Sequence, residues 1–125
     1  MLTLPATAKV YLAAGATDMR KCFDTLASVV TTVINGDPLS GHFFVFCNRR
    51  RNRLKILVWD GTGFWLHAKR LEKGTFAWPE PERGRAKIEL EPTALALLLD
   101  GIDLQDTKRR PWWRREPRTD EAPRA

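Results

Sequence analysis

The sequence lacks most of the residue patterns on which catalysis and metal binding depend. Its 125 residues include two cysteines and two histidines. They form no Cys-x-x-Cys pair and no Cys/His cluster, so neither a zinc site nor a redox motif is predicted. No H-E-x-x-H, G-x-S-x-G or glycine-rich phosphate loop is present. These absences favour a protein that is not an enzyme and needs no cofactor.

The carboxylates are also poorly placed for metal-dependent DNA cleavage, which needs several of them converging on two ions. Asp60 and Glu72 lie near opposite ends of one expected strand, roughly 35–40 Å apart at about 3.3 Å per residue. Asp18 is expected to favour the first turn of a helix, and His67 is expected to be structural. We therefore predict no metal site.

Long apolar runs are missing too. No window offers the roughly 18–20 uninterrupted apolar residues of a membrane-spanning helix, and the N-terminal stretch has no basic leader typical of a signal peptide. Cys22 and Cys47 lie within apolar patterns and are expected to be buried thiols rather than a disulfide. The composition predicts a cytoplasmic protein with no membrane partner.

The apolar residues that are present, 43% of the chain, suffice for one core. The pattern predicts a single α+β domain over residues 1–104. It begins with a strand at 9–13 and an amphipathic helix at about 18–34, with Thr17 as its N-cap. An antiparallel meander of about four strands follows at 42–47, 54–59, 64–71 and 75–78, with an edge strand at 87–90 and a short helix at 92–99.

Turn residues predict the register of the meander. Asp60-Gly61-Thr62-Gly63 is a strong hairpin signal, so Trp59 is expected to pair with Phe64. A five-residue loop at 48–52 would place Cys47 opposite Arg53. One face, expected to receive the first helix, then holds Phe44, Phe46, Leu54, Ile56, Val58 and Trp65. The other holds Arg53, Lys55, Leu57, Trp59, Phe64, Leu66 and Arg70, and is expected to be covered by the second helix, a partner or nucleic acid. A slip of one residue would exchange the faces.

Positive charge is concentrated in the middle of the chain. The net charge is +6, and residues 48–73 alone supply that excess, with Asp60 and Glu72 as their acidic members. Lysines and arginines keep strand edges soluble, but concentrated positive charge beside aromatic residues also indicates binding to a polyanion. The candidate DNA-binding residues of this block are Arg49, Arg50, Arg51, Arg53, Lys55, Lys69, Arg70 and Lys73.

The C-terminal segment 105–125 has lost apolar periodicity and is basic. It is expected to be a disordered tail. Within it, aromatic and cationic residues alternate as in segments that stack on bases and neutralise phosphates. Trp112, Trp113, Arg114 and Arg115 are therefore added to the candidate nucleic-acid-binding residues.

Several motifs resemble a known family. T-D-M-R-K near the start, K-I-L-x-W-D-G and K-R-L-E-x-G-x-F-x-W-P occur in order across roughly residues 5–103. They resemble the second-reading-frame (TnpB-type, Orf2-like) accessory protein of the insertion-sequence-sixty-six family of bacterial mobile elements. The resemblance implies a role in transposition beside a separate, larger transposase, and it supplies no catalytic residues.

Two functions remain open from the sequence. The first is a non-catalytic accessory protein that binds DNA at the element ends through the basic hairpin face and the tail and assists the transposase. The alternative is an adaptor that contacts the transposase, or another copy of itself, without binding DNA. The residues expected to contact a protein partner in that case are Leu57, Trp59, Phe64 and Leu66.

Overall fold

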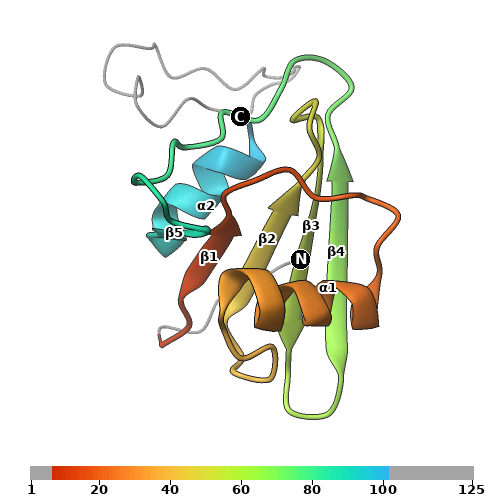
Figure 1. The fold of residues 1–125 in the computed structure, drawn as a ribbon. Coiled ribbons are helices and arrows are strands. Elements are labelled where there is room, and N and C mark those ends of the chain that lie inside the picture. The colour runs from red at the N-terminus through yellow and green to blue at the C-terminus, as the bar shows by residue number, and fades with distance from the viewer. Residues whose placement is uncertain (1–6, 102–125) are drawn as a thin grey trace.

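A mixed five-stranded sheet forms the centre of the computed structural model, which describes residues 7–101 (Figure 1). Its strands are β1 (Val10–Ala13), β2 (Phe43–Cys47), β3 (Arg53–Trp59), β4 (Phe64–Arg70) and β5 (Lys87–Leu90). They lie in the order β4-β3-β2-β1-β5. Only the β1–β2 pair is parallel, and the other neighbours are antiparallel. The predicted α+β class is confirmed.

Two helices pack on the sheet, and each belongs to a separate apolar cluster. The first, α1 (Phe23–Val29), continues as the π-helical η1 (Val30–Ile34), and its Leu26 packs with Phe44 and Leu57. The second, α2 (Pro92–Leu99), packs through Leu95 and Leu98 against Ile56 and its neighbours. All five residues of β2 are buried. A central strand covered on both faces explains why its sequence is apolar without alternation.

Three local predictions were wrong. The helix begins after Cys22 rather than Thr17, because Thr25 Oγ1 accepts the Cys22 N–H at 2.8 Å while Asp18 is bonded to Arg20. Cys22 is exposed and not buried as predicted, whereas Cys47 is buried and both are free thiols, as expected. Residues 75–78 form no strand: the buried Phe76 donates its N–H to the Arg51 carbonyl.

The β3–β4 register was predicted correctly, with Trp59 opposite Phe64. The β2–β3 register was wrong by one residue, since Cys47 pairs with Leu54 rather than Arg53. The reason is the loop. Asn48 donates its N–H to the Arg53 carbonyl at 3.0 Å, so that pair extends the ladder and the loop is one residue shorter than expected.

This one-residue difference between the predicted and the observed β2–β3 register changes which helix covers which face of the sheet. Phe44 and Phe46 lie with Leu57 under α1 and η1, whereas Leu54, Ile56 and Val58 lie in the α2 cluster. The face that carries Lys55 and Leu57 is therefore covered by the chain's own first helix. The prediction that the second helix, a partner or nucleic acid covers this face is wrong.

Asp60 holds the β3–β4 hairpin together. Its Oδ1 accepts the N–H groups of Thr62 and Gly63, both at 2.9 Å, and its Oδ2 accepts the Trp65 indole N–H at 2.8 Å. Gly61 has φ +102°, which glycine adopts without strain. The N–H groups of Thr62 and Gly63, with the Thr62 hydroxyl and the indole, lower the pKa of Asp60 from 3.8 to about 2.

This pKa predicts a pH dependence of stability. A carboxyl whose folded pKa is depressed stabilises the protein above its unfolded pKa and loses that contribution as the pH falls through the folded value. The Asp60 contribution should therefore be complete above about pH 4 and disappear between about pH 4 and 2. NMR titration of the Asp60 carboxyl measures its pKa. Thermal unfolding of wild type and Asp60→Asn as a function of pH measures its contribution to stability. If the Asp60→Asn variant loses stability as steeply as wild type over this pH range, protonation of Asp60 does not cause the loss.

Residues 1–6 and 102–125 lie outside the described residues. The predicted disorder of the 105–125 tail, the domain boundary at 104, and the nucleic-acid-binding roles of Trp112, Trp113, Arg114 and Arg115 therefore stay predictions.

Candidate nucleic-acid interface

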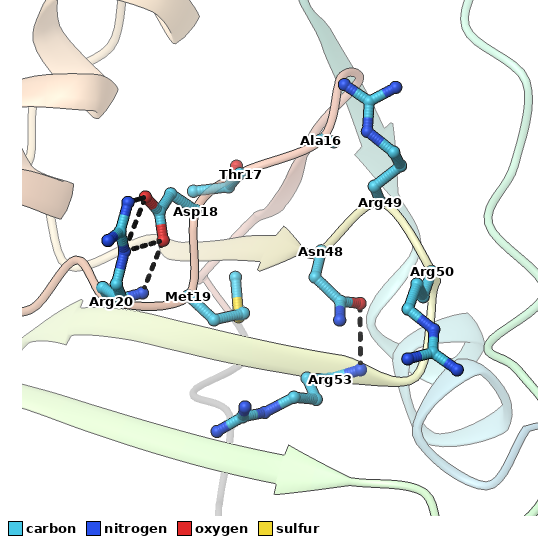
Figure 2. A pocket seen from close by; sticks show the side chains of 9 residues that line it. All are labelled: Ala16, Thr17, Asp18, Met19, Arg20, Asn48, Arg49, Arg50 and Arg53. Atoms are coloured by element: carbon cyan, nitrogen blue, oxygen red, sulfur yellow. Dashed lines mark hydrogen bonds and ion pairs between the residues drawn. The ribbon is translucent and has the colours of Figure 1, made fainter.

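A hollow of about 560 Å³ opens at one end of the sheet (Figure 2). Two segments form it: the loop between β1 and α1, and the loop between β2 and β3 together with the first residue of β3. The residues that line it are Ala16, Thr17, Asp18, Met19, Arg20, Asn48, Arg49, Arg50 and Arg53. Four of these are arginines and one is an aspartate, so the hollow is a cationic surface.

Asn48 organises the arginine loop. Its Oδ1 accepts the N–H groups of Asn52 and Arg53, each at 3.1 Å, and its side-chain amide donates to Asn52 Oδ1 at 2.8 Å. These bonds leave Arg49, Arg50 and Arg53 exposed around the hollow, and Figure 2 shows their guanidinium groups pointing in different directions. Within residues 7–101, none of the three is paired with a carboxylate.

Asp18 and Arg20 form an ion pair at the rim of the hollow. Arg20 Nη2 lies 2.7 Å from Asp18 Oδ2, and the Arg20 N–H donates to Asp18 Oδ1 at 2.9 Å. These hydrogen bonds from Arg20 lower the pKa of Asp18 to about 2. The carboxylate is thus ionised at neutral pH and partly offsets the arginine nearest to it.

Arg51 turns away from this group and toward the interior. Its backbone is left-handed, with φ +59°, and its guanidinium carbon lies 5.1 Å from the centre of the Trp78 ring. Nη2 donates to the Ala14 carbonyl at 3.5 Å, while Nη1 is buried without a partner among the described residues. The geometry favours a structural role for Arg51, connecting the loop to Trp78, over contact with DNA.

Lys55 is also engaged within the fold. Its Nζ donates to the carbonyl oxygens of Met19 and Lys21, each at 2.8 Å. The ammonium group therefore fixes the β1–α1 segment, which forms one wall of the hollow, to strand β3. The structure places Lys55 beneath that wall and not among the exposed cations.

The remaining predicted cations lie at the C-terminal end of β4 and in the turn beyond it. Arg70 is directly opposite Arg53 and pairs with Glu72 at 3.1 Å. Lys69 donates to the Leu99 carbonyl in the last turn of α2 at 2.6 Å, and Lys73 is exposed. Like charges opposite each other on adjacent strands are unfavourable, so an anion beside Arg53 and Arg70 would relieve their repulsion.

The residues predicted to contact a protein partner lie on the face under α1. Leu57 is completely buried, so its predicted contact with a partner is wrong for the folded chain. Phe64 and Leu66 are partly buried against the same cluster, and the Trp59 ring packs edge-to-face on Phe64 at 5.0 Å. The partner-binding roles of Trp59, Phe64 and Leu66 stay predictions.

Two residues of the hollow were missed. Arg20 and Asn48 were not among the candidate residues, and Asn48 was expected only to begin the 48–52 loop. The Asp18-x-Arg20 spacing gave a weak signal, since aspartate commonly accepts the N–H two residues on. No sequence signal brings Arg20 and Arg53 to the same hollow, because the segment that carries Arg20 is joined to β3 by the long-range Lys55 bonds.

Among residues 7–101 no group of three or more His, Cys, Asp or Glu side chains could hold a metal ion. In the same part of the chain, no helix is long and apolar enough to cross a membrane.

The fold and the hollow define a small α+β protein with one cationic end. Residues 8–109 match the family described as "IS66 Orf2 like protein", and the chain belongs to this family. The protein is thus associated with transposition of insertion sequences, in a family not known to be catalytic.

Two similar proteins come from Sinorhizobium fredii (strain NBRC 101917 / NGR234). The chain is 43% identical to uncharacterized protein y4hO over 103 residues, which is 82% of this chain and 88% of that protein. It is 33% identical to uncharacterized protein y4jC over 103 residues, covering 82% and 86%. No solved structure matches the chain significantly.

Proposed function

We propose that the chain is a non-catalytic accessory protein of transposition that binds the DNA of the element ends through its cationic end. The observation that carries the proposal is the set of exposed arginines around one hollow: Arg49, Arg50 and Arg53, with no carboxylate partner in the described part of the chain. Arginine neutralises phosphates and releases counterions from DNA, so binding through this surface is electrostatic and salt-dependent.

The arrangement favours contact with the phosphate backbone over reading of bases. The three side chains belong to a short loop and to the first residue of β3. Within residues 7–101, no helix or long ribbon extends from this end that could enter a major groove. Phosphate contacts position a protein on DNA without specifying sequence. In this proposal, sequence recognition at the element ends belongs to the separate transposase, which the small protein assists.

A titration with variants tests the DNA-binding proposal. Wild type should bind a labelled duplex with an affinity that falls steeply with salt. Replacing Arg49, Arg50 and Arg53 with glutamine should weaken binding at least about tenfold and reduce the slope of log affinity against log salt by roughly 2–3, since each phosphate contact contributes about 0.9. Fluorescence anisotropy at several salt concentrations measures both quantities.

The matched control is the glutamine variant of Lys9, Arg83 and Arg85, three exposed cations away from the hollow. It removes the same charge and should retain most of the affinity. Equal weakening by both variants, or no binding by wild type below about 100 µM, would contradict the proposal.

Assistance of the transposase is tested separately by footprinting the terminal repeats with and without it. Protection that is extended or strengthened when both proteins are present supports this part of the proposal. Identical footprints in the presence and absence of the small protein argue against it.

A further inference from the structure

Strand β4 forms one edge of the sheet, opposite the β5 edge (Figure 1). It runs regularly from Phe64 to Arg70 in continuous register with β3, without a bulge or a proline. Sheet edges are usually protected by short strands, prolines or charges along their length. Strand β5 fits that rule, because it is only four residues long and the residues whose backbone N–H and C=O groups face outward are the charged Lys87 and Glu89. The longer β4 does not, because its only charges are Lys69 and Arg70 at one end.

The hydrogen-bond pattern identifies the backbone groups that β4 leaves open. Asp60 N–H bonds to Gly63 and Leu71 N–H to Asn52, and antiparallel pairs alternate between bonded and non-bonded. Odd-numbered residues of β4 therefore bond to β3, and even-numbered ones point their N–H and C=O groups outward. These outward residues are Phe64, Leu66, Ala68 and Arg70, and within residues 7–101 their outward groups have no partner.

We propose that a second copy of this chain pairs with this edge, β4 against β4 in antiparallel orientation, with the two-fold axis at His67. In this register Phe64 faces Arg70 of the copy and Leu66 faces its Ala68, so all the outward residues are matched. A shift of the axis to Leu66 or Ala68 leaves one outward residue of each strand unmatched. The pairing is isologous, as a two-fold dimer requires.

Side-chain chemistry selects the same register. The N-terminal half of β4 is aromatic, with Phe64 and Trp65, and the C-terminal half is cationic, with Lys69 and Arg70. Antiparallel pairing about His67 sets Trp65 opposite Lys69 of the copy and Phe64 opposite its Arg70, which are favourable cation–π partners. Trp65 is 56% exposed in the single chain, so pairing would cover an aromatic ring that the chain itself leaves open.

The first helix would also gain a contact. A two-fold axis perpendicular to a continuous sheet keeps both copies of α1 on the same face. Since α1 begins on the β4 side (Figure 1), its first residue, Phe23, would approach its equivalent across the axis. Phe23 is 45% exposed in the single chain. This proposal concerns the edge opposite β5 and is independent of DNA binding.

Light scattering of the full chain tests the assembly. Wild type should approach twice 14.3 kDa as its concentration rises to about 100 µM, above the dissociation constants of most specific interfaces. Ala68→Pro removes one outward N–H from an exposed position, as edge strands tolerate, and should be monomeric with an unchanged circular dichroism spectrum. Glu89→Pro, the matched change on β5, should remain dimeric. A monomeric wild type, or a dimer unaffected by Ala68→Pro, would overturn the proposal.

A crosslink tests the register without relying on proline. In a Cys22→Ser background, His67→Cys places one new cysteine of each copy opposite the other, in a non-hydrogen-bonded pair. The two Cα atoms of such a pair lie about 4.5 Å apart, close enough for a disulfide after a small adjustment. Mild oxidation should give a covalent dimer rapidly, whereas Lys69→Cys in the same background should give little. Comparable rates would overturn the His67 axis. Protection of the Leu66 and Ala68 amides from hydrogen exchange in a monomer would mean that the chain covers its own β4 edge. That result would also overturn the proposed dimer.

Discussion

Replacing Leu57 with alanine is expected to lower the free energy of unfolding by about 3 kcal/mol. Leu57 is completely buried between Phe44 and the first helix, and truncation of such a side chain loses burial and leaves a cavity. Chemical denaturation measures the change. Leu39→Ala is the matched control, because Leu39 is 54% exposed, and it should change stability by less than about 0.5 kcal/mol.

The Leu57 result separates two interpretations of the same sequence pattern. If Leu57 served as an exposed contact for another protein, its truncation would weaken association and leave stability nearly unchanged. A stability loss close to that of Leu39→Ala would contradict the packing described above. The large loss expected here follows from the sheet register, because a strand face covered by α1 and η1 belongs to the core.

Replacing Lys55 with methionine is expected to lower the free energy of unfolding by about 2 kcal/mol, since hydrogen bonds to charged groups contribute about 1.5–3 kcal/mol each and the desolvation cost of the ammonium is recovered. Methionine retains most of the apolar stem. The change leaves the Met19 and Lys21 carbonyls without their donor. Urea denaturation measures the loss, and Lys73→Met, at an exposed turn position, should be nearly neutral.

Lys55→Met also tests whether Lys55 binds DNA directly. At a temperature where the variant remains folded, its affinity for DNA should fall less than that of the triple arginine variant. An affinity loss equal to the triple variant, with unchanged stability, would contradict the structural role and restore Lys55 to the interface.

The sequence predicted the parts of the fold that depend on short-range chemistry. The Asp60-to-Gly63 turn fixes its own pairing, because Asp60 bonds to Thr62 and Gly63 within the same turn. The β3–β4 register therefore followed from four residues. The α2 helix could likewise be predicted from Pro92 at its start and the leucines that follow it.

The β2–β3 register could not be predicted in the same way. Its loop contains no glycine, and Arg51 adopts the left-handed conformation there, which is uncommon for an arginine. The position is stabilised by contacts far along the chain, with Trp78 and with the Ala14 carbonyl. A turn whose geometry depends on distant residues leaves no local signal, and an error of one residue at that turn exchanged the two faces.

The sequence identified only some features of the candidate site, because the others also depend on contacts between distant residues. The charge distribution placed Arg49, Arg50 and Arg53 among the central cations, and the structure shows all three exposed around the hollow. The charge distribution could not separate them from Arg51 and Lys55, whose charges are directed at backbone carbonyls and an aromatic ring inside the fold. Charge counting treats these residues as equivalent, whereas burial and hydrogen-bond geometry distinguish them.

The two bonds from Lys55 have a further consequence for the hollow. They connect the Met19–Lys21 backbone directly to a central region of the sheet, so the wall beside Arg53 is ordered when the chain folds. Conformational entropy for that wall is then lost once, during folding, and not again when a ligand arrives. In the proposed complex with DNA, only the long arginine side chains would remain to be ordered on contact, so the rate of release should depend on side-chain motions and not on loop opening.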